Sequence, residues 1–390
     1  MSSPLRAVVV GAGWAGEGHT RALRSTGVEV VAICARNAAA VQAMATKLGV
    51  PEASIDWRET LLRVRPEIVS VATPAALRRE VIQAAVQGGA HLYVDKPLAT
   101  TAAEARGLYE MVDGAGLKHA FAVTHIYDPS VAWVAELIRE GAIGPLREVV
   151  ITQRSLYPPI LPWSWILSAA DGGGMVANGA IHVLAGLERI AGGPIVRVTG
   201  EAQQWVGTAP VVPDLHDFRE WMARGRELTP ESAAQYEQRA VDTDVAFSAL
   251  LRLAGPQGDV RATMVGGVGP HPPGETNRLR FYGEQGMLVA DGTFAFTGVA
   301  RMRPGAPEAE PLPVPERLVA QLPHLDDGPL YQNWAALARD FVADVRGEPH
   351  QAYPTLRDGW RLQEVIDTIR ESTGWHDVPT EAARPVSVAG

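Results

Sequence analysis

The sequence predicts an α/β protein in two parts, an N-terminal doubly wound parallel sheet and a C-terminal α/β part with a large open, mostly antiparallel sheet. In the first part, short apolar runs alternate with helix-period segments, which is typical of parallel strands covered on both faces. In the second part the runs are longer and alternate apolar with polar residues, which favours a sheet with one open face. We therefore expect one domain over residues 1–125 and another over residues 126–390.

Five apolar runs in the first part predict its strands: Arg6–Val10, Val28–Ile33, Ile68–Ala72, His91–Val94 and Ala120–Val123. The segments between them predict helices over Trp14–Ser25, Asn37–Leu48, Ala76–Gly88 and Thr101–Gly114. This steady alternation of strand and helix is the pattern of repeated βαβ units.

The second part predicts strands over Leu146–Gln153, Ile195–Ala202, Val245–Leu253, Val260–Gly267, Arg278–Tyr282 and Met287–Asp291. It predicts helices over Asp128–Glu140, Ala180–Ile190, Tyr331–Arg346 and Thr355–Ser372. Pro304–Pro315 and Thr208–Arg226 are rich in proline and charge, so we expect exposed loops there. A tryptophan in the second of these loops indicates a lid or an interface.

Composition excludes several classes of protein. The chain has 44 Asp+Glu against 35 Lys+Arg, and this net charge of −9 disfavours nucleic-acid binding. One cysteine, Cys34, excludes an internal disulfide and a cysteine-cluster metal site, and no histidine or carboxylate spacing predicts a metal site of another kind. No run approaches the ~20 apolar residues of a membrane span, so we expect a cytoplasmic protein without a membrane partner.

A glycine-rich turn follows the first predicted strand, in the run Gly11-Ala12-Gly13-Trp14-Ala15-Gly16. In a G-x-G-x-x-G turn of this kind, the first glycine allows the tight bend and the second lets the backbone approach a pyrophosphate. The third allows the helix to pack on the strand. The helix N-terminus adds favourable partial charge for the anion. Between a strand and a helix, this run predicts a Rossmann dinucleotide-binding site.

The second predicted strand ends in Cys34-Ala35-Arg36-Asn37, without the carboxylate that usually meets the ribose hydroxyls of NAD. Arg36 is instead suited to a 2′-phosphate, so the sequence favours NADP. The alternative is that Arg36 is a solvated surface residue and that the cofactor is NAD.

These features and several later motifs resemble the Gfo/Idh/MocA family, the glucose–fructose oxidoreductase and inositol dehydrogenase group. The most specific match is the run from Gly89 to Leu98, which follows the family element G-x-H-V-x-x-E-K-P-L with Asp95 in place of Glu. Further matches, in order along the chain, are Gly18-His19, Thr73-Pro74, Gly141–Gly144, Gly172–Gly174, Asp340-Phe341, Pro354-Thr355 and Asp358-Gly359.

The resemblance implies a Rossmann domain followed by an open-sheet domain, with cofactor and substrate between them. It implies an NAD(P)-dependent oxidoreductase that moves hydride between nicotinamide and a secondary alcohol or ketone of a sugar, cyclitol or related derivative. The cofactor-binding residues it implies are Gly11, Gly13, Trp14, Ala15, Gly16, Ala35, Arg36, Asn37, Thr73, Pro74, Asp95, Lys96, Pro97 and His125.

The catalytic residues implied are Lys96, His182 and Asn178, and the substrate-binding residues are Lys96, Trp163, Trp165, Asn178 and His182. Asn178 and His182 are four residues apart, so on a helix they share a face. Asn178 stands where the family usually has an acid and cannot accept a proton itself. For a lone histidine on an apolar helix, a buried core residue is the safer interpretation, and the preceding glycines and the matching spacing are what favour catalysis for His182. The two tryptophans equally anchor a loop.

Ala185, Ile126 and Arg78 also depart from the residues usual in the family at the matching places, which puts its usual proton relay and polyol substrate in doubt. Two other functions therefore stay open. One is an enzyme that keeps its NAD(P) tightly bound and uses transient oxidation for elimination or glycoside cleavage. The other is a cofactor-sensing regulator without catalysis, as in the family's repressor branch. Because open apolar sheet faces usually find a partner, we also expect a homodimer or homotetramer.

Overall fold

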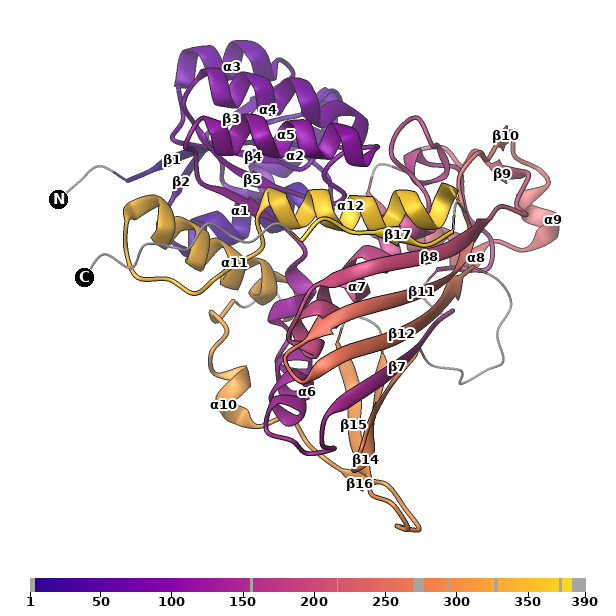
Figure 1. The fold of residues 1–390 in the computed structure, drawn as a ribbon. Helices are drawn as coiled ribbons and strands as arrows, with labels where there is room; N and C mark the ends of the chain where they lie inside the picture. Colours follow the sequence, from indigo (N-terminus) through magenta and orange to yellow (C-terminus); the bar gives the residue numbers. More distant parts are fainter. Residues whose placement is uncertain are drawn as a thin grey trace.

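The computed structural model describes residues 4–154, 157–215, 217–268, 277–292, 295–325, 329–371 and 374–380. Its first sheet is six-stranded and parallel, in the order β3-β2-β1-β4-β5-β6 (Figure 1). The strands are β1 (Arg6–Val10), β2 (Glu29–Cys34), β3 (Glu52–Ser54), β4 (Ile68–Val71), β5 (His91–Val94) and β6 (His119–Phe121). The five predicted strands are confirmed within a few residues, whereas the three-residue β3 was not predicted. From β1, the strands β2 and β3 are added on one side and β4, β5 and β6 on the other. Doubly wound folds bind ligands at this change of strand order, between β1 and β4.

Helices cover both faces of this sheet because neighbouring strand residues point to opposite sides. The helices are α1 (Trp14–Ser25), α2 (Ala38–Leu48), α3 (Trp57–Val64), α4 (Arg78–Gln87) and α5 (Ala102–Gly114); α3 was not predicted. Val8 and Val10 pack in one core with α3, α4 and α5, while Ala7 and Val9 pack in the other with α1 and α2. Side-chain caps begin several helices, for example Asn37 of α2, which accepts from the backbone N–H of Ala40 at 3.0 Å.

The second sheet has nine strands in the order β16-β15-β14-β13-β7-β12-β11-β8-β17, and all its pairs are antiparallel except β7 with β12. The longer strands are β7 (Leu146–Gln153), β8 (Ile195–Gln203), β11 (Ala246–Gly255), β12 (Gly258–Gly267), β13 (Arg278–Gly283), β14 (Gly286–Gly292) and β15 (Phe296–Met302). β16 (Glu310–Pro311) and β17 (His376–Asp377) form its edges. The six predicted strands are present, and β15, β16 and β17 are additions, with β16 inside the loop predicted over Pro304–Pro315. This large mixed sheet confirms the predicted fold class.

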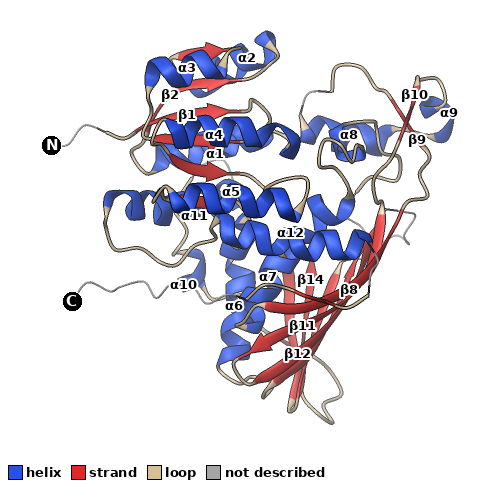
Figure 2. Cartoon of the chain, turned by 45° about the horizontal axis from the view of Figure 1, so that its top comes forward, coloured by secondary structure: helices blue, strands red, loops and turns tan. Residues whose placement is uncertain are grey.

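Helices α6 (Pro129–Arg139), α7 (Ile181–Ala191) and α12 (Leu356–Glu371) lie on one face of this sheet (Figure 2). α11 (Pro329–Arg346) returns to the first sheet, where Trp334, Leu337 and Phe341 join the core beneath α1 and α2. The type of sheet changes near residue 125, and a domain division there stays a proposal, since α11 packs on the first sheet. No helix in the described ranges is long and apolar enough to cross a membrane.

The exposed loop predicted over Thr208–Arg226 is wrong in part, because β9 (Thr208–Pro210) and helix α8 (Phe218–Glu227) lie in it. Asp217 caps α8 by accepting from the backbone N–H of Arg219 at 2.8 Å. The inner side of the helix carries Trp221, which is only 2% exposed. α9 (Pro230–Ala233), β10 (Gln238–Ala240), which pairs with β9, and the short α10 (Glu316–Val319) complete the fold.

Candidate functional site

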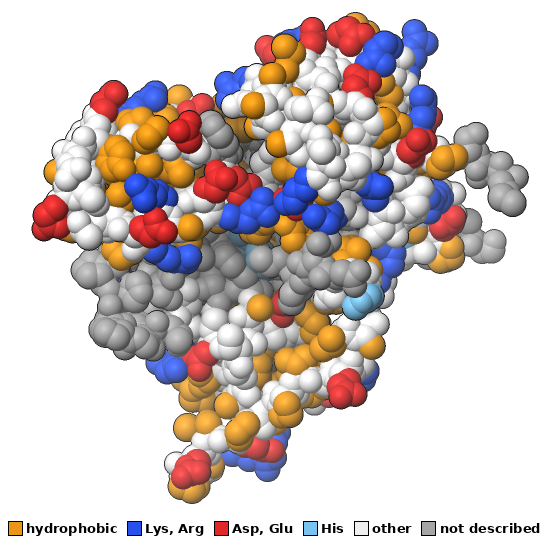
Figure 3. All heavy atoms as spheres, turned by 180° about the vertical axis from the view of Figure 1, so that it is seen from behind, with side chains coloured by type: hydrophobic (Ala, Val, Ile, Leu, Met, Phe, Trp, Pro, Cys, Tyr) orange, Lys and Arg blue, Asp and Glu red, His pale blue; other side chains and the backbone are white. Residues whose placement is uncertain are grey.

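A cavity of about 1240 Å³ begins at the carboxyl edge of the parallel sheet and extends to α7 and α8. Figure 3 shows the surface hollowed between the upper and lower parts of the molecule. Of the predicted site residues, those that line the cavity are Gly11, Gly13, Trp14, Ala15, Ala35, Arg36, Asn37, Thr73, Pro74, Asp95, Lys96, His125, Trp165, Asn178 and His182. Gly16, Pro97 and Trp163 are absent from this lining.

The glycine turn at the head of the cavity has the form that a dinucleotide requires. Gly11 has φ +129°, and a side chain there would meet the carbonyl oxygen of Ala72 at 2.4 Å. A side chain on Gly16 would meet the carbonyl oxygen of Gly11 at 2.0 Å, so this glycine sets the packing of helix on strand. Gly13 has open space around it and begins α1 without a side-chain cap, so the first N–H groups of the helix face the cavity. These residues fit the pyrophosphate of a dinucleotide.

Below this turn, Thr73 adds a second sign of a bound polar group. Its hydroxyl oxygen is buried and has no hydrogen-bond partner among the described residues, although Thr73 lines the cavity. A buried hydroxyl without a partner is costly, so a ligand that supplies one is favoured here.

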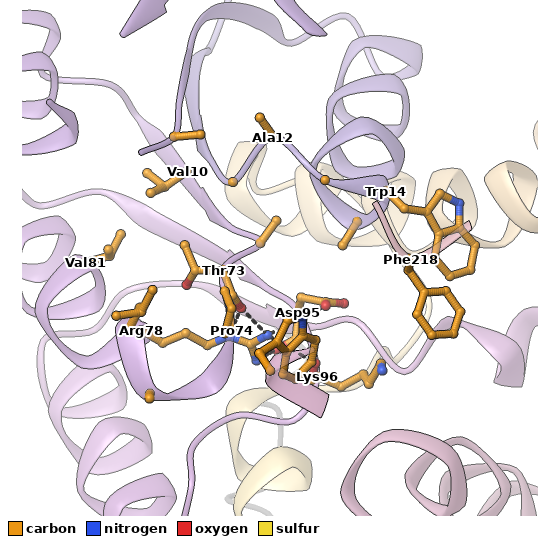
Figure 4. Close-up of a pocket in the computed structure, with 18 of the residues that line it drawn as sticks. Val10, Ala12, Trp14, Thr73, Pro74, Arg78, Val81, Asp95, Lys96 and Phe218 are labelled. Atoms are coloured by element: carbon orange, nitrogen blue, oxygen red, sulfur yellow. Dashed lines mark hydrogen bonds and ion pairs between the residues drawn. The ribbon is translucent and has the colours of Figure 1, made fainter. Parts of the chain in front are cut away.

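Arg78 holds the loop after β5, which carries Lys96, in place. The sequence analysis did not assign Arg78 to the site. Arg78 is 1% exposed, and its guanidinium donates to the carbonyls of Thr73 at 2.7 Å and Lys96 at 3.1 Å, and also to those of Asp95 and Pro97 (Figure 4). The Lys96–Pro97 peptide bond is cis. The sequence could have indicated this role, because Arg78 follows a buried strand closely, and a buried guanidinium needs many hydrogen-bond acceptors.

Asp95 lies between three positively charged or protonatable groups. Its carboxylate is 3.7 Å from His19 Nε2 and 3.6 Å from the Arg78 guanidinium, and His19 is held in turn by Ser70 at 2.9 Å. Burial acts to raise the pKa of Asp95, but His19, Arg78 and Lys96 outweigh it and leave that pKa below its usual value. The carboxylate is therefore charged at neutral pH and balances part of the positive charge of Arg78 and Lys96.

The C-terminal part brings Asn178 and His182 to Lys96. The Lys96 ammonium donates to the backbone carbonyl of Asn178 at 3.4 Å, and the rings of His182 and His125 meet edge to face at 4.3 Å. A π-helical turn over Val176–Ala180 precedes α7 and carries Asn178 into the cavity. The side-chain amide of Asn178 donates to the carbonyl of Gly174 at 3.0 Å, which leaves its buried oxygen without a partner among the described residues.

Electrostatics favour the uncharged form of His182. Burial, then the neighbouring His125 and Lys96, hold the pKa of His182 well below its ordinary value. Burial also lowers the pKa of Lys96, with Arg78 adding to this effect and Asp95 opposing it. A neutral imidazole beside an ammonium is an arrangement that can exchange a proton with a substrate hydroxyl.

Apolar side chains form the outer wall of the cavity, from segments between β7 and β10. They are Tyr157, Trp165, Ile166, Leu215, Phe218 and Met222. Trp163 instead lies under the Arg239 guanidinium, 3.5 Å from its ring centre, and donates to the carbonyl of Ala240 at 3.1 Å. The structure thus places Trp165 on the cavity and Trp163 in a loop-anchoring position. No cluster of three metal-ligating side chains occurs among the described residues.

Comparison with known proteins places this geometry in a family context. Residues 5–125 match the model of an oxidoreductase family with an NAD-binding Rossmann fold, and residues 131–289 match the GFO/IDH/MocA C-terminal domain. A levoglucosan dehydrogenase from Pseudarthrobacter phenanthrenivorans is 26% identical over 87% of both chains. A D-glucoside 3-dehydrogenase from Escherichia coli is 28% identical over 56% of this chain and 63% of its own. The structure of a levoglucosan dehydrogenase with NADH has a TM-score of 0.77 at 21% identity and covers 97% of this chain and all of its own.

Proposed function

Because the chain belongs to the GFO/IDH/MocA oxidoreductase family, we propose that it is an NAD(P)-dependent dehydrogenase of a secondary alcohol in a sugar derivative. One observation carries this proposal. Lys96, from the parallel sheet, is 3.4 Å from the Asn178 carbonyl, and both line one cavity with Gly13 and His182. A reacting oxygen placed beside these side chains lies within reach of a dinucleotide held at the glycine turn.

The proposed roles follow from the chemistry of each side chain. When bound, the nicotinamide supplies the carbon that accepts or returns hydride. In the direction of oxidation, the Lys96 ammonium hydrogen-bonds the alcohol oxygen and stabilises its developing negative charge. His182 accepts the hydroxyl proton in its neutral form as the C–H hydride leaves. The free oxygen of the Asn178 side chain accepts a hydrogen bond from a neighbouring hydroxyl, and Arg78 positions Lys96.

For the cofactor we propose NADP, with NAD as the alternative. Arg36 is exposed at the end of β2, lines the cavity and has no carboxylate beside it in the sequence to reject a phosphate. Asn37 is occupied as the cap of α2, so Arg36 is the side chain at this strand end that is suited to a 2′-phosphate.

The cavity wall narrows the proposed substrate to one with a polar edge and an apolar body. Hydrogen-bonding groups gather at Lys96, His125, Asn178 and His182, whereas the outer wall is aromatic and aliphatic. A free sugar with hydroxyls all round would leave several of them desolvated against this wall, at a cost for each. A glycoside or similar ring alcohol with an apolar substituent buries that substituent instead. The names of the two relatives, a levoglucosan dehydrogenase and a D-glucoside 3-dehydrogenase, support a sugar derivative.

A matched pair of substrates tests this proposal. Purified protein is assayed for reduced nicotinamide with NADP⁺ and with NAD⁺ on methyl glycosides and on aryl or alkyl glycosides of the same sugar. We expect kcat/KM about tenfold or more higher with the apolar substituent, because roughly 60 Å² of extra apolar burial is worth that factor. Equal kcat/KM within the pair overturns the substrate class. Absence of turnover with either cofactor across sugars, anhydro sugars and cyclitols overturns the dehydrogenase.

We also propose a homodimer or homotetramer through the open face of the second sheet. Leu250, Tyr282 and Met302 are large apolar side chains exposed there, between 36% and 46%. Leu250 pairs across the strands with Thr199 and Thr263, which places it within the sheet and away from its edge strands. Light scattering on the wild type and on Leu250→Glu tests this, since a dimer through this face dissociates in the variant. With one cysteine, the buried Cys34, the fold does not depend on an internal disulfide, and we propose the cytoplasm as its compartment.

A further inference from the structure

Helix α8 reaches from the C-terminal part of the chain onto the glycine turn. Phe218, its first residue, stacks on Trp14 of the turn with ring centres 5.6 Å apart and planes 11° from parallel. Both rings line the cavity, as Lys96 does, and Figure 4 shows the two rings side by side. The turn that faces the cofactor is therefore covered by a side chain from outside the Rossmann domain.

An ion pair fixes the same contact from the next residue. The Arg219 guanidinium donates to the carboxylate of Glu17 at 3.0 Å, and Glu17 is the fourth residue of α1. Glu17 is 1% exposed and also pairs with Arg21 at 3.0 Å and Lys47 at 2.8 Å. A buried carboxylate with three cationic partners keeps two of them when Arg219 is removed, so this contact can be tested without stranding a buried charge.

Trp221, one helical turn after Phe218, anchors α8 in its own part of the chain. Trp221 is buried, stacks on Phe218 at 5.7 Å and donates to the carbonyl of Pro162 at 2.6 Å. Phe218 thus lies between a fixed tryptophan on one side and the cofactor turn on the other. For the turn to open toward solvent, the Phe218–Trp14 and Arg219–Glu17 contacts have to break.

We propose that Phe218 and Arg219 form a clamp on the cofactor turn, which slows the departure of the nicotinamide dinucleotide from the cavity. The clamp acts through Trp14 and Glu17, so Phe218 and Arg219 are positioning residues for cofactor binding. This inference rests on the proposed function, since it requires that an NAD(P) molecule binds at the turn. It adds that the residence of that molecule is set by a helix of the other part of the chain.

Cofactor dissociation measures the clamp directly. The protein is loaded with NADPH, or with NADH if that binds more tightly, mixed rapidly with excess oxidised cofactor, and followed by nicotinamide fluorescence. We expect Phe218→Leu, which keeps apolar bulk but loses the stack, to release cofactor about three- to tenfold faster. For Arg219→Gln we expect about two- to threefold, because this ion pair is partly exposed.

A neighbouring arginine gives the matched control. Arg224 lies on the same helix but bonds Glu227 and the Tyr236 hydroxyl, both at 3.0 Å and away from α1, so Arg224→Gln should release cofactor at the wild-type rate. Added salt should speed release from the wild type by a larger factor than from Arg219→Gln, because salt weakens the contacts of the cofactor phosphates in both proteins but the Arg219–Glu17 ion pair only in the wild type.

The results separate the clamp from the function. If folded Phe218→Leu and Arg219→Gln release cofactor at the wild-type rate while the wild type turns over substrate, the clamp is wrong and the dehydrogenase stands. If the wild type binds neither NADPH nor NADH, both proposals fall. Faster release in both variants with an unchanged Arg224→Gln supports the clamp.

Discussion

The two ends of the cavity are built in different ways. At the cofactor end, one continuous segment dominates, in which Gly11, Gly13 and Gly16 shape the turn between a strand and a helix, with the side chains of Thr73 and Arg36 beside it. At the substrate end, side chains from three distant segments converge, with Lys96 after β5, His125 after β6, and Asn178 with His182 at the start of α7. Backbone sites tolerate change in side chains and are general, whereas converging side chains define one reaction.

The two ends should respond most differently to a substitution of Lys96, which belongs to the substrate end. Lys96→Met keeps a long apolar chain but removes the ammonium beside the Asn178 carbonyl. We expect kcat/KM to fall about 10³-fold, the size of effect seen when one donor to a developing oxyanion is lost. NADPH affinity should change by less than a few-fold, because the glycine turn is untouched. Turnover within tenfold of the wild type would remove Lys96 from the chemistry.

Two glycines of the turn give a contrast at the other end. Gly11→Ala places a side chain 2.4 Å from the Ala72 carbonyl oxygen at φ +129°, so we expect a loss of roughly 2 kcal/mol or more in the free energy of unfolding. Gly13→Ala meets nothing within 4 Å in the protein, so its stability should stay close to that of the wild type.

Gly13→Ala should instead change the affinity for the cofactor. A methyl group there occupies the approach of the pyrophosphate, and we expect NADPH affinity to fall about tenfold or more. Thermal melts with and without NADPH check both variants. A Gly13→Ala protein that binds NADPH normally would contradict the placement of the pyrophosphate at this turn.

Asn178 tests how the substrate end depends on its own packing. Its amide nitrogen donates to the Gly174 carbonyl, so Asn178→Asp sets a carboxylate oxygen against a carbonyl in a buried position. Restoring the acid usual in the family should therefore lower activity, by about tenfold, and lower the melting temperature. Activity at or above the wild-type level would show instead that a carboxylate serves as the proton acceptor here.

These contrasts also explain what the sequence could predict. The glycine turn and the run around Lys96 are local, so their residues, spacing and flanking strands could be interpreted directly. β3 is too short and polar to give a clear period. α3 was missed although Trp57, Leu61 and Val64 follow the i, i+4, i+7 spacing of a helix. α8 was taken for a loop because of its charges, although Phe218, Trp221, Met222 and Gly225 follow the i, i+3, i+4, i+7 spacing of a helix.

The tertiary contacts of the site lay outside what one sequence shows. Arg78 was noticed only as a departure from the family, because its role depends on four carbonyls that the fold collects around it. Likewise, nothing in the local sequence distinguishes Trp163 from Trp165. Arg239 of β10 packs on Trp163, whereas Trp165 lines the cavity.

Arg36 tests the specificity of the cofactor end. If its guanidinium meets the 2′-phosphate of NADP, Arg36→Ala should lower the ratio of kcat/KM for NADP⁺ over NAD⁺ by about tenfold, while kcat/KM for NAD⁺ stays nearly constant. Kinetics with both cofactors on one substrate measure this ratio. A wild type that already prefers NAD⁺ and does not respond to the substitution would assign Arg36 to the solvated surface.

The smallest expected effect is a shift in the pH dependence of the rate, which reports on His182 and Lys96 at the substrate end. Because the pKa of His182 is lowered, the neutral imidazole that accepts the proton persists below pH 6.5 and is lost only as pH falls through its depressed pKa in the folded protein. The acid limb of kcat/KM for alcohol oxidation, which reports the protein before the alcohol binds, should therefore lie below pH 6.5. The pKa of Lys96 is lowered as well, so loss of its ammonium should give an alkaline limb below pH 10.5. The limbs are measured from kcat/KM for the alcohol, and His182→Gln should lose the acid limb together with most of the rate. An acid limb above pH 6.5 would mean that His182 is more easily protonated than its buried place beside His125 and Lys96 implies, and the base would have to be sought elsewhere in the cavity.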